Sequence, residues 1–157
     1  MIWAEFEARA PEMAAFGRAQ FEQRGGVVIG TVRRDGTPRI SLVEPCILDG
    51  QLFLGMLWRS RKALDLLNDP RLVLHNAICT NRGDESEFTL RGRVSDIRDP
   101  GVRSRFVQAV SRRTRWEEPR FHLFSVDVES AAFVTYERVE QHVRVWPQGI
   151  EFRRPYG

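Results

Sequence analysis

Alternating apolar and polar positions along most of the chain predict a protein built mainly of β-strands. Between 87 and 94, for example, Phe88, Leu90 and Val94 alternate with polar or charged neighbours, as in a strand with one face against a core. Asp-Gly pairs at 35–36 and 49–50 predict tight hairpin turns. On this basis we expect strands over 27–33, 38–45, 51–57, 72–78, 87–94, 121–128, 132–138, 142–146 and 150–153.

Helical patterns interrupt this series in three places. An N-terminal helical segment covers 1–24, in two pieces that meet at Pro11. A second helix is expected over 61–68, with Ser60 as its N-cap and with Ala63, Leu64 and Leu67 facing inward. A third follows Asp99-Pro100 and runs over 100–113.

The connections between neighbouring strands are too short for crossovers, so antiparallel pairing is expected. Closing such a sheet removes its exposed edges. The fold class favoured for 1–157 is therefore a single mainly β domain with peripheral helices: a closed or split antiparallel β-barrel of six to eight strands.

Composition excludes several functional classes. With 157 residues and 42% hydrophobic content the chain can bury one core. It has no apolar run long enough to span a membrane, and its acidic N-terminus does not resemble a secretion signal. The spacing of Cys46 and Cys79 indicates neither a metal site nor a disulfide framework. A cytoplasmic protein without a metal is expected. The basic run at 112–115 is better explained by a helix C-terminus than by nucleic-acid binding.

The sequence identifies no catalytic residue. His75, His122 and His142 are scattered among apolar neighbours, and no nucleophile motif accompanies them. No glycine-rich Rossmann or Walker loop is present. We expect each histidine to be structural or to line a pocket.

Lys62 is the only lysine among the 24 Lys and Arg residues. It follows Ser60 and Arg61 at the start of the second predicted helix. A hydroxyl, a guanidinium, an ammonium and free helix N–H groups together would bind an anion such as a phosphate. The alternative is a solvated helix start with two surface cations.

Three segments in a fixed order carry a resemblance to a known family. Residues 52–63 read LFLGMLWRSRKA, residues 30–41 form the hairpin GTVRRDGTPRIS, and residues 90–94 read LRGRV. Across 25–97 the chain resembles the pyridoxamine 5'-phosphate oxidase-like superfamily of FMN-binding split barrels. The resemblance implies an FMN-dependent oxidoreductase acting on a small molecule, and a homodimer with the cofactor at its interface.

The resemblance also assigns cofactor-binding residues. The FMN phosphate would be held by Arg39, Ser60, Arg61 and Lys62. The isoalloxazine ring would lie along Ile40, Ser41, Leu42, Gly55 and Met56. Glu87 and Arg144 take positions that face the flavin in the family, and Tyr136, His142 and Arg144 are candidates for lining the substrate face.

Several residues depart from the family pattern. Glu44 and Glu140 stand where the oxidase has cations, and Glu87 stands where a glutamine is common. A carboxylate repels a substrate phosphate rather than binding it. We therefore expect a substrate other than pyridoxamine phosphate.

Three alternatives remain open at this stage. The cofactor could be the deazaflavin F420, whose acidic tail would engage further cations such as Arg59. The protein could bind flavin or haem without turnover, with His75 or His142 as a haem ligand. It could also be a degenerate barrel that binds nothing.

Overall fold

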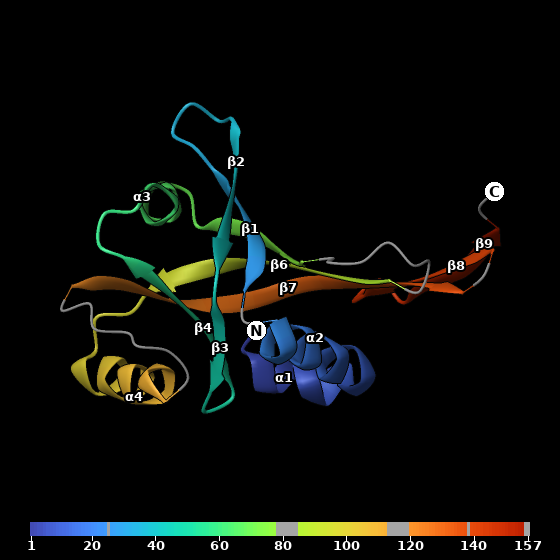
Figure 1. Ribbon diagram of the computed structural model, residues 1–157, viewed down its shortest axis with the longest axis horizontal. Helices are drawn as coiled ribbons and strands as arrows, with labels where there is room; N and C mark the ends of the chain where they lie inside the picture. Colours follow the sequence, from blue (N-terminus) through green and yellow to red (C-terminus); the bar gives the residue numbers. More distant parts are fainter. Residues whose placement is uncertain (25, 78–84, 113–119, 138, 156–157) are drawn as a thin grey trace.

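The computed structural model describes residues 1–24, 26–77, 85–112, 120–137 and 139–155. Within these residues nine strands form one antiparallel sheet (Figure 1). The strands are β1 (Val27–Val32), β2 (Pro38–Val43), β3 (Pro45–Leu48), β4 (Gln51–Leu57), β5 (Arg71–Asn76), β6 (Ser86–Asp96), β7 (Phe121–Glu137), β8 (Glu140–Trp146) and β9 (Ile150–Pro155).

Seven strands follow one another in the order β2-β1-β5-β6-β7-β4-β3, and the sheet is not closed. The predicted mainly β split barrel is thereby confirmed; seven strands lie on this path, within the predicted range of six to eight, and β8 and β9 bring the sheet to nine. β8 and β9 extend the sheet outward from the second half of β7, at the right of Figure 1.

Four helices lie against the sheet within the described residues: α1 (Trp3–Arg9), α2 (Pro11–Arg24), α3 (Arg61–Asn68) and α4 (Pro100–Ser111). In Figure 1, α1, α2 and α4 lie on one side of β6 and β7, and α3 lies on the other. The helix α4 begins as expected, because the Asp99 side chain accepts a 2.7 Å hydrogen bond from the N–H of Val102.

Several predicted strands have different bounds in the structure, and the ends expected at 78 and 138 lie outside the described residues. The strand expected over 38–45 ends at Val43, and the chain turns through Glu44 into β3. The break expected between 128 and 132 was wrong, since β7 runs without interruption for 17 residues. A bulge explains the irregular pattern there: Arg91 pairs with Ser130 but Gly92 pairs with Val128, so Glu129 is passed over.

The main core fills the inside of the barrel and includes the buried faces of the N-terminal helices. Trp3, Phe6 and Phe21 from α1 and α2 pack there with strand residues such as Ile29 and Phe88. A second cluster lies beneath α4, where Phe106 contacts Phe53 and Phe121. Both clusters lie on the helix-covered sides of the strands.

The opposite, outer face of the barrel is less covered. A ladder of directly paired residues crosses it: Leu42 pairs with Val28, Val28 with His75, and His75 with Thr89. Neighbouring strands lie about 4.8 Å apart, so this ladder spans roughly 14 Å. Ile40 lies on the same face as Leu42, and their side chains are 77% and 67% exposed.

The buried face of α3 differs from the one predicted. Its buried residues are Ala63, Asp65 and Leu66, whereas Leu67 is 46% exposed. The expectation for Leu67 was wrong because the helix places a carboxylate, rather than an apolar side chain, toward the barrel. Among the described residues, no helix combines the length and hydrophobicity that crossing a membrane requires.

Candidate functional site

The start of α3 presents a buried polar group that has no partner. Ser60 occupies the N-cap position, but its side chain makes no capping hydrogen bond. Its Oγ atom is buried, and no hydrogen-bond partner exists for it within the described residues. An unsatisfied buried hydroxyl costs about 1–3 kcal/mol, so this atom is poised to bond an added acceptor or donor.

Lys62 lies on the side of α3 that faces the end of β2. Its Nζ atom donates a hydrogen bond to the carbonyl oxygen of Leu42. Partial burial lowers the pKa of Lys62, and the nearby Glu44 carboxylate opposes part of that effect. The ammonium is thus partly desolvated beside a backbone oxygen, and a further anionic neighbour would stabilise its charged form.

A buried carboxylate joins α3 to the first hairpin. Asp65 Oδ2 accepts a 2.8 Å hydrogen bond from Thr31 Oγ1 and a 2.6 Å charged hydrogen bond from Arg39 Nε. The Arg39 side chain is 24% exposed and that of Asp65 only 9%. Arg39 therefore lies against α3, as the resemblance implies, but with its Nε atom bonded to Asp65.

A cavity of about 540 Å³ opens between α3 and the turn that joins β1 to β2. Its lining comes from one face of α3 and from the hairpin: Arg33, Arg34, Asp35, Arg39, Arg61, Leu64, Asp65 and Asn68. Arg39 and Arg61 line it together, whereas Ser60 and Lys62 are not part of its lining. The four predicted phosphate ligands thus gather around the start of α3 but face two sides of it.

The predicted ring-binding residues do not all face one surface. Ile40 and Leu42 lie on the open outer face of the barrel, and Ser41, between them, points the other way. Met56 is 1% exposed and packs in the main core, so its side chain is not at the surface. Gly55 pairs with Leu123 on the neighbouring strand. The ring-binding assignments stay predictions. Ile40 and Leu42, which lie on the outer face, fit such a role better than Ser41 or Met56 does.

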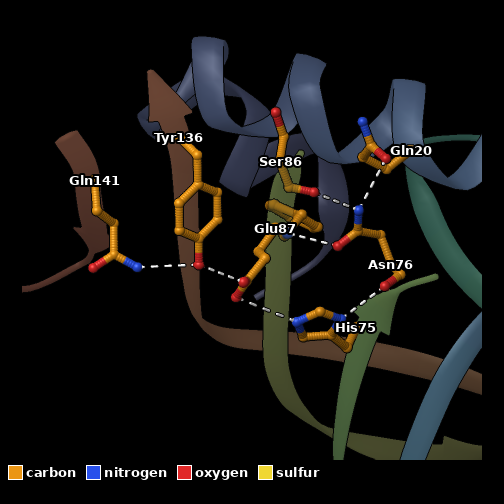
Figure 2. A network of polar contacts seen from close by, with 8 residues as sticks. Gln20, His75, Asn76, Ser86, Glu87, Tyr136 and Gln141 are labelled. Carbon is orange, nitrogen blue, oxygen red and sulfur yellow. Dashed lines mark hydrogen bonds and ion pairs between the residues drawn. The ribbon is translucent and has the colours of Figure 1, made fainter. Parts of the chain in front are cut away.

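A polar network occupies the outer face further along the same sheet (Figure 2). The Tyr136 hydroxyl donates a 2.6 Å hydrogen bond to Glu87 Oε1, and Gln141 Nε2 donates to Tyr136 at 3.1 Å. His75 Nε2 lies 3.8 Å from the second carboxylate oxygen of Glu87. Glu87 is thereby held between a phenol and an imidazole.

Next to this network, at the right of Figure 2, Asn76 ties three elements together. Its Nδ2 atom donates to Gln20 Oε1 on α2 and to the carbonyl oxygen of Ser86, and its Oδ1 accepts from the N–H of Phe88. Sequence reasoning missed this residue. Its signal was a lone amide at an inward position of an apolar strand, where only a satisfied polar group is stable.

The contact with Glu87 determines the ionisation of Tyr136. Acceptance of the phenolic hydrogen by Glu87 raises the pKa of Tyr136, burial raises it further, and the bond from Gln141 lowers it. In a Tyr156→Phe background, which leaves Tyr136 as the only tyrosine, we expect Glu87→Gln to lower this pKa. Titration of the phenolate absorbance measures the change.

The control for that titration is Gln141→Ala. It removes the bond that favours the phenolate, so it should move the pKa of Tyr136 upward instead. Equal pKa values in Glu87→Gln and its parent would show that the hydrogen bond does not govern this phenol.

Arg144 and His142 lie on the other face of the sheet from Glu87. Arg144 pairs with Phe133, whereas Glu87 pairs with Val134, so successive side chains alternate between the faces. The Arg144 guanidinium lies 5.0 Å above the Phe133 ring and bonds Glu12 of α2 at 2.9 Å. His142 Nε2 lies 2.8 Å from Glu151 on β9. Within one chain the structure does not bring Arg144 or His142 to Glu87.

One further histidine is buried at an end of the barrel. His122 is 7% exposed, and Trp58 stacks on it with ring centroids 4.5 Å apart. Burial lowers the pKa of His122, which favours the neutral imidazole. This agrees with the structural role that the sequence suggested for it.

The chain is similar in sequence to a known protein family. The family model described as "Pyridoxamine 5'-phosphate oxidase" matches residues 13–135. The chain belongs to this family. The resemblance seen in the sequence is thereby confirmed, and the oxidase-family match covers the barrel strands together with α2, α3 and α4.

Solved structures with this fold include both flavin- and haem-binding proteins. An FMN-binding, pyridoxamine 5'-phosphate oxidase-related protein from Nostoc punctiforme has a TM-score of 0.61 and 14% identity, over 94% of this chain and 97% of that one. HutZ, the haem storage protein from Vibrio cholerae, has a TM-score of 0.61 and 16% identity, over 76% and 89%. A haem-binding protein from Mycobacterium smegmatis has a TM-score of 0.62 and 18% identity, covering 81% of this chain.

This chain spans about half of the Mycobacterium smegmatis protein, namely 55%. At such identities the likeness shows the fold alone. No curated protein matched the sequence.

Proposed function

We propose that the protein binds FMN through its phosphate at the start of α3 and serves as an FMN-dependent oxidoreductase for a small organic molecule. The observation that carries this proposal is the buried, unpartnered hydroxyl of Ser60, two residues before the partly desolvated ammonium of Lys62. The residues fit a phosphate: one oxygen would satisfy Ser60, and the free helix N–H groups would face the same anion.

Two arginines complete this predicted phosphate site. The Arg61 side chain lines the adjoining cavity and makes no hydrogen bond or ion pair within the described residues. Arg39 uses Nε for Asp65, so its two terminal nitrogens are left for an anion. The three cations face two sides of the helix start, so this site requires the Arg39 or Arg61 side chain to turn toward a phosphate that Lys62 holds.

The outer face supplies the surface for a flat ring. When bound, the flavin would supply hydride transfer, and the protein would supply position and electrostatics. The ladder from Leu42 through Val28 leads from the neighbourhood of Lys62 to His75 and Glu87. We propose that a second copy of the chain covers this face, because Ile40 and Leu42 are too exposed for an isolated barrel and their burial would exclude water from the ring.

The acidic residues argue for a substrate other than pyridoxamine phosphate. Glu87 is held in the outer-face network, and Glu44 is exposed at the end of β2. Glu140 lies 3.9 Å from Arg153 on β9, which only partly offsets its charge. At Glu44 and Glu140 a phosphorylated substrate would meet carboxylates where the resemblance requires cations.

Lys62→Ala is expected to weaken FMN binding by about 1.5–3 kcal/mol, the scale of a hydrogen bond to a charged group. This corresponds to a rise in Kd of roughly 10- to 150-fold. Quenching of flavin fluorescence during titration of the apoprotein measures it. Arg98→Ala is the control, because this cation is 88% exposed and lies between β6 and α4. An unchanged Kd in Lys62→Ala would exclude the proposed phosphate role.

A haem-binding protein without turnover is the second candidate. The observation in its favour is His75, whose Nδ1 lies 2.7 Å from the carbonyl oxygen of Asn76. If Nδ1 carries the proton, the Nε2 lone pair would bind a metal on the open face in place of its 3.8 Å contact with Glu87. His142 is less suitable because its Nε2 is engaged by Glu151. F420 would need the same phosphate site with additional cations.

The visible spectrum of the purified protein separates these candidates. Bound FMN gives two flavin bands, whereas haem gives one intense Soret band that His75→Ala would shift or abolish. Reduced F420, NADH and NADPH, tried in turn as reductants of the loaded protein, would then identify the electron donor.

A further inference from the structure

The turn before α3 holds the chain in a conformation that its sequence does not favour. The N–H of Ser60 donates a 3.1 Å hydrogen bond to the carbonyl oxygen of Leu57, which closes a four-residue turn through Trp58 and Arg59. Arg59, the third residue of this turn, has a φ of 55°. A positive φ there is the pattern of a type II turn, in which glycine or asparagine is the usual residue. An arginine adopts this conformation at a cost in free energy, so the turn requires stabilisation from other contacts.

Three stacked rings connect this turn to the core of the barrel. The ring centroids of Trp58 and His122 lie 4.5 Å apart, with 8° between the ring planes. His122 is stacked in turn with Phe124, at 6.0 Å and 13°. Phe124 is fully buried in the main core, whereas Trp58 is 51% exposed. The second residue of the turn is therefore held against the core through the imidazole.

Ring contacts, and no hydrogen bond within the described residues, hold the imidazole of His122. This side chain is 7% exposed, and its Nε2 atom is buried without a partner among the residues that the structure describes. Such an atom is unfavourable in free energy. His122 pairs with Met56 on β4, two residues before Trp58, so the register of β4 and β7 places the imidazole beside the turn.

The turn leads directly into the proposed anion site. Ser60 ends the turn and is the N-cap of α3, and its carbonyl oxygen accepts a 3.0 Å hydrogen bond from the N–H of Leu64. The direction of the Ser60 hydroxyl and of the free N–H groups in the first turn of α3 therefore depends on this turn. A site that is rigid before its ligand arrives loses less entropy on binding and so binds more tightly.

We propose that Trp58 and His122 are positioning residues, which hold the strained turn at Arg59 and so preorganise the start of α3 for an anion. The ring stack offsets the unfavourable φ of Arg59, and loss of the stack releases Ser60. The inference rests on the proposed function for the identity of the anion. The conformation of the turn, however, is measured without any ligand.

Amide hydrogen exchange of the whole protein, followed residue by residue with NMR, tests the hold on the turn. In Trp58→Ala the amides of Ser60 and Leu64 are expected to exchange about tenfold faster or more, because their hydrogen bonds close the turn and the first turn of α3. Trp58→Phe should retain slow exchange, since a phenyl ring also stacks on the imidazole. The control is the amide of Arg103, which donates to Asp99 at the start of α4 at 3.1 Å and should not change.

Substitutions of Arg59 separate relief of the strained turn from a general loosening of the protein. Added to Trp58→Ala, Arg59→Gly should restore slow exchange, because glycine adopts a positive φ freely. Arg59→Ala removes the same charge but keeps the unfavourable conformation, so it should restore nothing. His122→Leu, which fills the buried space without a planar ring, should accelerate exchange at the same two amides as Trp58→Ala does.

Titration with FMN then measures the effect on the anion site. The Kd for FMN is expected to rise roughly fivefold or more in Trp58→Ala and to stay near the native value in Trp58→Phe. Three results would each overturn the proposal: native exchange rates in Trp58→Ala or His122→Leu, equal restoration by Arg59→Gly and Arg59→Ala, or an unchanged Kd despite faster exchange.

Failure of the flavin assignment is distinguishable from failure of this inference. If the native protein does not bind FMN, the same variants are titrated with orthophosphate. A Kd for orthophosphate that rises in Trp58→Ala and not in Trp58→Phe would reject the flavin and keep the positioning role. Absence of binding by both anions would overturn both proposals.

Discussion

Gly92→Ala is expected to destabilise the protein by about 3 kcal/mol or more, the upper range for overpacking at a buried position. A Cβ atom at residue 92 would lie 2.2 Å from the carbonyl oxygen of Asp127 and 3.3 Å from Val126 Cγ1. The obstacle is backbone, which cannot rotate away as a side chain can. Relief would require β6 and β7 to separate at the bulge. Urea unfolding monitored by circular dichroism measures the loss.

Gly26→Ala is the matched control for this substitution. A Cβ there would lie 3.8 Å from its nearest neighbour, the carbonyl oxygen of Val43, which is an ordinary contact. We expect a change of less than about 1 kcal/mol. If both variants unfolded at the same urea concentration, the close approach of β6 and β7 at the bulge would be refuted.

The second large effect is expected at Asp65. Asp65→Ala leaves the Arg39 guanidinium and the Thr31 hydroxyl without their shared partner in a mostly buried place. Removal of one member of a buried ion pair costs roughly 3–5 kcal/mol, and the 24% exposure of Arg39 moves the expectation toward 3 kcal/mol. The free energy of unfolding from urea titration is again the measured quantity.

An exposed ion pair provides the comparison. Arg93 and Glu129 contact each other at 3.0 Å with both side chains more than half exposed, so Glu129→Ala should cost less than about 1 kcal/mol. Adding Arg39→Ala to Asp65→Ala should recover part of the loss, because no unpaired charge remains. A double variant whose losses simply add would show that the two residues are not coupled.

The sequence predicted those features of the fold that local chemistry determines. The Asp-Gly turns are in place, with positive φ values at Gly36 and Gly50 and also at Asp49. The N-cap at Asp99 and the helix after Ser60 were likewise readable from neighbouring residues. Family motifs then supplied the barrel topology, which periodicity alone could not have distinguished from other antiparallel folds.

The errors arose where the local structure depends on contacts with segments that are distant in the sequence. The interruption expected inside β7 is a bulge that depends on its pairing with β6, and a single-strand pattern does not reveal it. The sequence did not single out Asp65, because its partners lie 26 and 34 residues away in the chain. Leu67 is exposed because these contacts turn the Asp65 side of α3 toward the barrel.

In the candidate site, too, the sequence indicated residues that are neighbours in the chain but not contacts between distant residues. Ser60, Arg61 and Lys62 were found because they are consecutive and begin a helix. The surroundings of Arg144 were not, because its partner Glu12 is 132 residues away and its face follows from the register of β7 and β8. Arg34 and its cavity were also missed, since the hairpin turn looked like an ordinary solvated loop until α3 was placed beside it.

Among the described strands β9 pairs only with β8, so one row of its backbone amides and carbonyls has no strand partner at this edge of the sheet. All six of its residues are exposed. Such a margin invites other chains to add a strand and begin aggregation. The Arg153 and Arg154 side chains repel an identical approaching strand, and Pro155 cannot donate to it. The residues of β9 thus oppose the edge-to-edge aggregation that an exposed strand would otherwise favour.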